Sequence, residues 1–265
     1  MKMCSIASGS SGNCIFVGSE ETSFLVDAGI SGKRAIAGVE SLDRSMTELD
    51  GIFVTHEHSD HIKGLGVLAR KFGIPIYATK GTIDEIERTQ PIGKLPEGIF
   101  HAIKPDQDTV IGDMTIHPFR LSHDAAEPVG YRFESEGKKA AVATDMGVYD
   151  EYIVEQLSGL DTLLLEANHD VRMLEVGRYP YYLKRRIASD RGHLSNETAG
   201  QLLGRILHDH MGHIFLGHLS HENNYERLAF ETVCSEITMG DNPYRAADFR
   251  ISVAHRDMIS EAIEF

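Results

Sequence analysis

Three histidines and one aspartate stand within six residues of the chain, in the stretch GIFVTHEHSDHIKG at residues 51–64. The preceding GIFVT is apolar and β-branched, which predicts a strand that ends where the histidines begin. His56 and His58 are two positions apart, so on an extended backbone both imidazoles point to one side and can hold one ion. Asp60 and His61 follow as the chain turns, and they supply ligands for a second ion.

Other metal motifs do not fit this stretch. A zinc protease helix needs H-E-x-x-H, and no histidine pair here is spaced by four. The pattern of a calcium-binding loop is also absent. The simplest alternative is a loop of solvated histidines with Asp60 as a helix cap. Four ligand-type residues at one strand end favour a metal site over that alternative.

The pattern H-x-H-x-D-H after a strand resembles the metallo-β-lactamase superfamily. That resemblance implies an α/β fold, the metallo-β-lactamase-type αββα four-layer sandwich, in which helices flank two packed mixed sheets. Further family elements follow in order across nearly the whole chain: FLVDAG with Asp27, LSHDA with His123, VATDMG with Asp145 and LGHLSHENN with His218.

The resemblance also implies roles for these residues. One ion is expected on His56, His58 and His123. The second ion is expected on Asp60, His61 and His218. Asp145 is expected to bridge the two ions, and Asp27 to hydrogen-bond the histidine loop and orient it without touching metal.

Two ligand assignments have competitors nearby in the sequence. His117 precedes His123 by six residues but is expected inside a strand, so His123 is the predicted ligand. His221 competes with His218, which is favoured because the strand IFLGH ends at it.

Two such ions can share and acidify a hydroxide, so hydrolysis is the expected chemistry. Zn²⁺ suits these ligands, and the same nitrogen and oxygen donors accept Mn²⁺ or Fe²⁺. His58 argues against the flavodiiron branch of the superfamily, which carries glutamate there.

The substrate is suggested by what lies between Asp145 and His218. The interval is too short for the large inserted domain of the β-CASP nucleases. The segment EANHDVRMLEVGRYPYYLKRRIASDRGHLSNE and the N-terminal CSIASGSSGN resemble the YycJ/WalJ-like subgroup, described as DNA exonucleases that attack the 5′ end. GHLSNETA more distantly resembles the region where tRNA-processing and cyclic-phosphodiesterase relatives keep a catalytic histidine, here His193.

The same segment is basic and carries aromatic residues. Arginine can neutralise phosphates and tyrosine can stack on splayed bases. We therefore predict Lys184, Arg185, Arg186 and Tyr182 as substrate-binding residues. The alternative is a solvated helix whose tyrosines pack inward, because charge runs are often simply exposed faces.

Asp60 and His193 are the predicted catalytic residues. His193 precedes the helix start HLSNET, where free amides favour an anion. It can touch the scissile phosphate or protonate the departing oxygen. The alternative is a helix-flanking histidine that bonds only to the backbone.

Short apolar runs bounded by Gly, Asn or Asp predict the strands that position these residues. They are MCSIAS, NCIFVGS, SFLVDAG, GIFVT and IPIYAT early in the chain, then a hairpin turning at Gly112 and Asp113, VGYRFES, KKAAVATD, DTLLLEA and GHIFLGHLS. Helices are predicted in IKGLGVLARKFG, from about Ser195, and in NNYERLAFETVCSEI. No Pro/Gly/Ser linker divides the chain, so one domain over residues 1–265 is expected.

Composition narrows the class of protein. A net charge of −14 argues against broad, sequence-independent coating of nucleic acid, although a local basic groove is compatible with it. Three cysteines without a C-x-x-C pair fit a reducing compartment. The N-terminus shows no apolar region typical of a signal peptide, and no apolar run approaches transmembrane length, so neither secretion nor membrane spanning is expected. A cytoplasmic protein is therefore expected.

Together these features predict a dinuclear metal-dependent phosphodiesterase, a DNA exonuclease directed to the 5′ end. The main alternative is a thioester or lactone hydrolase of the glyoxalase II kind, which uses the same ligand set but does not need the basic segment with His193. A non-catalytic metal or nucleic-acid binding module is disfavoured, because it would leave a complete ligand set without a use.

Overall fold

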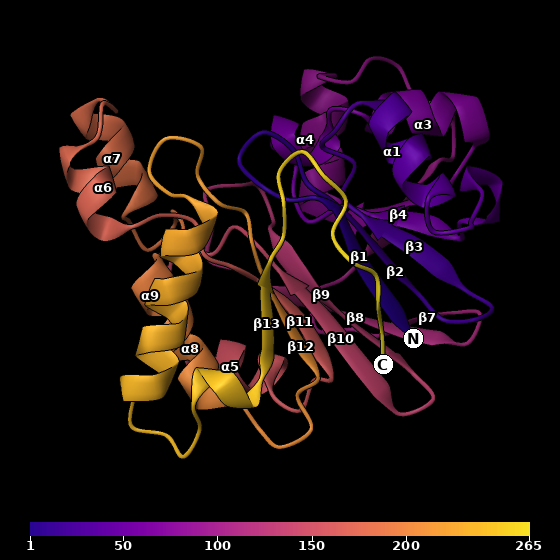
Figure 1. Cartoon of the computed structure of the whole chain (residues 1–265). Helices are drawn as coiled ribbons and strands as arrows, with labels where there is room; N and C mark the ends of the chain where they lie inside the picture. Colours follow the sequence, from indigo (N-terminus) through magenta and orange to yellow (C-terminus); the bar gives the residue numbers. More distant parts are fainter. The chain divides into compact units, whose positions relative to one another are not determined.

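The structure is a computed structural model that describes residues 1–265 (Figure 1). Two compact units make up the chain. The first comprises Met1–Arg120, Ala125–Lys138 and His255–Phe265, and the second comprises Leu121–Asp124 and Lys139–Ala254. The single domain expected from the sequence stays a prediction.

A seven-stranded mixed sheet forms one layer of the first unit, in the order β14-β1-β2-β3-β4-β5-β6. Strands β1, β2 and β3 are antiparallel, whereas β3 to β6 run parallel. The strands are β1 (Lys2–Ala7), β2 (Cys14–Gly18), β3 (Ser23–Val26), β4 (Gly51–Phe53), β5 (Ile76–Thr79), β6 (Phe100–Ile103) and β14 (Ile263–Glu264). Parallel strands end at the same edge, so the turns after β3 and β4 are neighbours.

The second layer of the first unit is an antiparallel meander of β7 (Thr109–Ile111), β8 (Met114–Arg120) and β9 (Val129–Ser135). Its first hairpin turns at Gly112, with φ +57°, as the sequence predicts. Aromatic rings join the layers, because Phe53 lies 5.2 Å from Tyr131, centroid to centroid. The Tyr131 hydroxyl also donates a 2.7 Å hydrogen bond to the Val54 carbonyl.

Helices pack against the other face of the first sheet. They are α1 (Gly32–Glu40), α2 (Ser59–Ile62), α3 (Leu65–Phe72) and α4 (Lys80–Thr89), with a short 3₁₀ turn η1 (Met46–Glu48). Val39, Leu68 and Ile86 share one apolar core with sheet residues such as Ile52. Helix α3 ends at Gly73 in the left-handed conformation, as predicted.

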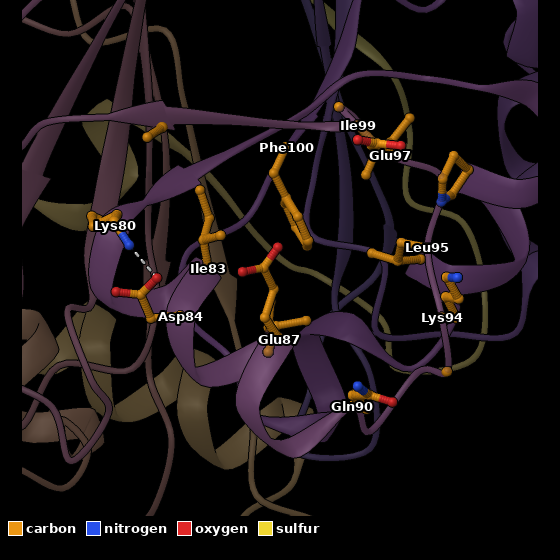
Figure 2. A pocket seen from close by; sticks show the side chains of 15 residues that line it. Lys80, Ile83, Asp84, Glu87, Gln90, Lys94, Leu95, Glu97, Ile99 and Phe100 are labelled. Carbon is orange, nitrogen blue, oxygen red and sulfur yellow. Dashed lines mark hydrogen bonds and ion pairs between the residues drawn. The ribbon is translucent and has the colours of Figure 1, made fainter.

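A cavity of about 900 Å³ lies beside α4 and β6 (Figure 2). Ile83, Leu95 and Phe100 point into it, and Glu87 projects from α4 toward the same space. None of its lining residues is a candidate site residue.

The second unit is built on parallel strands in the order β13-β12-β11-β10. These are β10 (Lys138–Ala143), β11 (Thr162–Glu166), β12 (His213–Gly217) and β13 (Arg250–Val253). Its helices are α5 (Glu151–Leu157), α6 (Val171–Val176), α7 (Tyr181–Ile187), α8 (Asn196–Ile206) and α9 (Glu226–Met239), with a 3₁₀ turn η2 (Ala246–Asp248). Again the carboxyl ends of the strands share one edge, where Asp145, Glu166 and His218 stand.

Local signals read from the sequence account for several element ends. Ser195 caps α8 by accepting a hydrogen bond from the Thr198 amide.

The three cysteines are free thiols, and burial raises the pKa of Cys4 to about 12. No helix combines the length and the apolar run that crossing a bilayer requires.

The turn after β3 holds the backbone of the histidine motif. Ala28 donates its amide to the His61 carbonyl at 2.8 Å, and Asn13 donates its amide to the Asp60 carbonyl at 2.8 Å. Gly29 lies against the same peptide, because a Cβ at this position would stand 1.6 Å from the Asp60 carbonyl oxygen. Only glycine fits here without displacing the motif.

We expect Gly29→Ala to lower the free energy of unfolding by about 3 kcal/mol or more, because the methyl group must push backbone aside. Gly98→Ala is the matched control: it also adds a methyl group, at φ +74° with nothing within 4 Å. That control should lose only about 1–2 kcal/mol from the left-handed backbone. Urea unfolding measures both variants, and equal stability of the two would contradict the close packing at Gly29.

Candidate metal centre

A buried carboxylate orients His61 in the first unit. His61 Nδ1 lies 2.7 Å from Asp27 Oδ2, and neither side chain is exposed. The Thr55 amide and hydroxyl also donate to Asp27, at 2.8 and 2.9 Å. Because the Nδ1 proton of His61 is hydrogen-bonded to Asp27, the Nε2 atom of the ring keeps its lone pair for a metal ion.

The other ligand-type residues of the motif gather around His61. Its ring centroid lies 4.1 Å from that of His56, and the rings of His56 and His58 are 4.6 Å apart. Asp60 Oδ2 stands 3.5 Å from His61 Nε2, with 24% of the Asp60 side chain exposed. Thr55 Oγ1 is 3.0 Å from His56 Nδ1, so that ring too is turned with Nε2 outward. The structure therefore brings all four motif residues together.

A second buried carboxylate organises the other unit. Glu166 Oε1 lies 2.7 Å from His193 Nδ1 and 3.0 Å from His218 Nδ1. Glu166 Oε2 accepts the amides of Met146 and Leu194, at 2.9 and 3.2 Å. Four donors thus use both oxygens of one fully buried side chain.

Glu166 stays ionised in this setting. Burial by itself raises its pKa, but the charge of His193 and the hydrogen bonds from His193 and His218 lower the pKa to about 2. An ionised Glu166 fixes a proton on Nδ1 of each imidazole and leaves each Nε2 pointing away from it. His218 can then bind an ion through Nε2, and His193 can exchange a proton at Nε2.

Sequence reasoning missed Glu166. The available signal was a glutamate at the end of the apolar run TLLLE, because a strand buried along its length leaves a terminal carboxylate needing partners. The two histidine partners of Glu166 lie 27 and 52 residues further along the chain.

Asp145 lies among these groups. Its Oδ1 atom is 3.2 Å from His218 Nδ1 and 3.5 Å from His193 Nδ1. One ligand atom from each of Asp145, Glu166, His193 and His218 lies within 4.8 Å of the others. The hydrogen bonds above occupy both oxygens of Glu166. Asp145 and His218 are therefore the better ligands of the group.

His123 is better suited than His117 to the role of metal ligand. His123 is 2% exposed, places Nδ1 3.0 Å from the Gly192 carbonyl, and has Nε2 3.8 Å from Asp145 Oδ1. His117 lies within β8 and bonds the exposed Asp108.

His218 and His221 differ in the same way. The His218 side chain is 1% exposed, whereas that of His221 is 66% exposed and bonds Glu222. Its burial and its contacts with both Glu166 and Asp145 therefore favour His218, the residue expected from the end of the strand.

Backbone conformation marks three strand-end positions. Asp27, Asp145 and His218 have φ of 62°, 58° and 53°, in the left-handed region that non-glycine residues rarely adopt. Such a conformation raises the free energy by about 1–3 kcal/mol and persists where the surroundings impose it. Each of these residues follows a buried strand and belongs to the predicted metal centre or its support.

The predicted substrate-binding residues lie on α7. Tyr181 and Tyr182 are 75% and 74% exposed, so they do not pack inward. The Arg185 guanidinium stands 6.0 Å from the centroid of the Tyr181 ring, and Lys184 Nζ donates to the Glu175 carbonyl at 2.7 Å. Arg186 forms an ion pair with Asp124 while 48% of its side chain stays exposed, and its role in substrate binding stays a prediction.

Comparisons with known proteins identify the class. Residues 22–229 match the family model of the beta-lactamase superfamily domain. The exodeoxyribonuclease YycJ of Bacillus anthracis is 43% identical over 224 residues, 84% of each chain. The exodeoxyribonuclease WalJ of Streptococcus pneumoniae is 41% identical over 236 residues, covering 89% of this chain and 88% of WalJ.

A solved structure gives the same fold. Zn²⁺-bound PqqB from Methylobacterium extorquens aligns with a TM-score of 0.70 at 17% identity, over 98% of this chain and all of PqqB. Strand-end histidines and aspartates on this fold define a metal-dependent hydrolase. The chain belongs to the metallo-β-lactamase superfamily. The predicted α/β sandwich is thereby confirmed.

The donor set fits a divalent cation. His56, His61, His123 and His218 each have Nδ1 within hydrogen-bonding distance of an oxygen: Thr55, Asp27, Gly192 and Glu166, respectively. Such contacts fix the tautomer and raise the basicity of the ligating nitrogen. Imidazole and carboxylate donors suit Zn²⁺, Mn²⁺ and Fe²⁺.

We expect Glu166→Gln to lower the free energy of unfolding by about 1–3 kcal/mol, because the new amide group cannot accept all four donors. Metal affinity should fall about 10- to 100-fold through the loss of orientation at His218. Glu151→Gln is the control, since Glu151 is an exposed carboxylate paired with Arg205. Urea unfolding and Mn²⁺ titration by calorimetry measure the two effects. Wild-type affinity in Glu166→Gln would show that Glu166 does not orient a ligand.

Proposed function

We propose that this protein is a dinuclear metal-dependent DNA exonuclease directed to the 5′ end. The observation that carries the proposal is the likeness to YycJ and WalJ, both exodeoxyribonucleases, over most of each chain. The contact of His193 with the buried Glu166 supports it, because a phosphodiesterase needs a group that protonates the departing oxygen.

Two divalent ions, Zn²⁺, Mn²⁺ or Fe²⁺, would be bound by seven residues. His56, His58 and His123 would hold one ion, Asp60, His61 and His218 would hold the other, and Asp145 would serve both. Bound there, the ions would lower the pKa of water and stabilise charge on the phosphate. The oxygen contacts at Nδ1 of four of these histidines support the ligand set.

The protein's own residues would move the protons. His193, whose Nδ1 lies 2.7 Å from the Glu166 carboxylate, would deliver a proton from Nε2 to the departing oxygen. Glu166 stabilises the positive ring and returns it to the same orientation after each turnover. Asp60, whose side chain is 24% exposed, would accept a proton from the attacking water.

The DNA would be held by the exposed surface of α7. Arg185 and Lys184 offer positive charge to phosphates, and Tyr182 offers an exposed ring face to a base. This local basic surface explains how a chain of net charge −14 can bind DNA at one place.

Metal analysis tests the ligand set. We expect about two ions per wild-type chain, and lower occupancy of both in Asp145→Asn, because a bridging ligand serves each ion. The Asn variant keeps a residue that tolerates the left-handed backbone. His117→Ala should retain full occupancy. A single ion in the wild type, or full occupancy in Asp145→Asn, would contradict the dinuclear centre.

The reaction class is tested through His193. Wild-type protein with Mn²⁺ should degrade end-labelled DNA in preference to RNA and should leave S-lactoylglutathione intact. His193→Ala should keep both ions and the fold while kcat for DNA drops about 100- to 10,000-fold, the usual contribution of a general acid. A p-nitrophenyl phosphodiester should recover much of that rate, because p-nitrophenolate leaves without a proton.

Three outcomes count against this assignment. Full activity of His193→Ala on DNA would remove His193 from the reaction. Loss of metal in that variant would mean that His193 is a ligand. Cleavage of the thioester but not of DNA would favour the glyoxalase II kind of hydrolase.

A further inference from the structure

The turn that carries His123 is enclosed by the segment that follows α7. Ser122 Oγ donates to the Asp190 carbonyl at 2.6 Å, and His123 Nδ1 lies 3.0 Å from the Gly192 carbonyl. Arg191 donates twice to the His123 carbonyl, at 3.0 and 3.2 Å. The end of the basic segment is therefore part of the support of a predicted metal ligand.

Arg186 contacts the next residue of the same turn, Asp124. Its guanidinium engages both oxygens of Asp124, with Nη2 2.9 Å from Oδ1 and Nε bonded to Oδ2. The same Asp124 Oδ1 stands 3.4 Å from His123 Nε2, the nitrogen that faces Asp145. The carboxylate held by Arg186 thus lies directly beside a metal-ligating atom.

A carboxylate in this position competes for the metal. An ion on His123 would lie about 2.0–2.1 Å from Nε2. Asp124 Oδ1 stands 3.4 Å from that nitrogen, so a small rotation of an unrestrained Asp124 would bring the oxygen onto the ion. Carboxylate oxygen is a good ligand for Zn²⁺ and Mn²⁺, whereas a catalytic site must keep a position open for the substrate. A bidentate guanidinium occupies one lone pair on each carboxylate oxygen and fixes the plane of the carboxylate.

We propose that Arg186 is a positioning residue that restrains Asp124 from the ion at His123 and so keeps a coordination position open for the scissile phosphate. The inference rests on the proposed metal centre. It separates two adjacent arginines of α7. Arg185 stands over the exposed Tyr181 ring and is the proposed DNA contact, whereas Arg186 would act through Asp124.

The experiment compares four variants with the wild type. Arg186→Ala removes the restraint, Arg186→Lys keeps the positive charge but not the two-pronged contact, and Arg186→Ala with Asp124→Asn removes the competing carboxylate as well. Arg205→Ala is the matched control, because it breaks another exposed arginine–carboxylate pair, with Glu151. Each protein is measured for kcat and KM on DNA at several salt concentrations, and for Mn²⁺ affinity without DNA.

We expect kcat of Arg186→Ala and of Arg186→Lys to fall about tenfold, the lower range for loss of a group that orients a metal centre. KM and its salt dependence should stay at wild-type values, and Mn²⁺ should bind at least as tightly. The double variant should recover most of kcat. Arg205→Ala should match the wild type throughout.

Other results would overturn the proposal. A raised KM with a flatter salt dependence in Arg186→Ala, and normal behaviour of Arg186→Lys, would make Arg186 a phosphate contact. Failure of Asp124→Asn to restore kcat would remove Asp124 as the competitor. If the wild type cleaves no DNA, the proposed function fails. The Mn²⁺ affinities then test the role of Arg186 separately. If Arg186→Ala binds Mn²⁺ more weakly than the wild type, Arg186 does not restrain a competing ligand.

Discussion

The carboxylate of Glu166 is the contact on which the second unit's chemistry depends. A fully buried negative charge is tolerated only where donors surround it, and here two imidazoles and two backbone amides do so. Its geometry sets the direction of His193 and His218 together. Asp27 has the corresponding role for His61 in the first unit. Each unit therefore orients one or two of its histidines with a buried carboxylate at the end of a strand.

Parallel strands explain why such residues can meet. The carboxyl ends of β10, β11 and β12 share one edge, so residues far apart in sequence reach the same few ångströms. Helix α8 begins just after His193, and Ser195 fixes where it starts. Local strand and helix signals thus decide where long-range contacts form.

The strands and the histidine motif could be predicted because their signals are local. Apolar runs predict β1 to β5, and ligand-type residues at strand ends predict His56, His61 and His218. Glu166 and Arg186 could not be assigned in this way. A glutamate after an apolar run gives no sign of its partners, and an arginine in a basic run gives no sign of a carboxylate partner 62 residues earlier in the chain.

The left-handed backbone at Asp27, Asp145 and His218 has an evolutionary consequence. Selection acts on these positions twice, once for the donor atom and once for a conformation that few side chains accept. Asparagine and glycine meet the second requirement without the first. A lineage that abandons catalysis can therefore drift to these residues and keep the fold, so relatives that retain only a binding role are recognisable by Asn or Gly at the three strand ends.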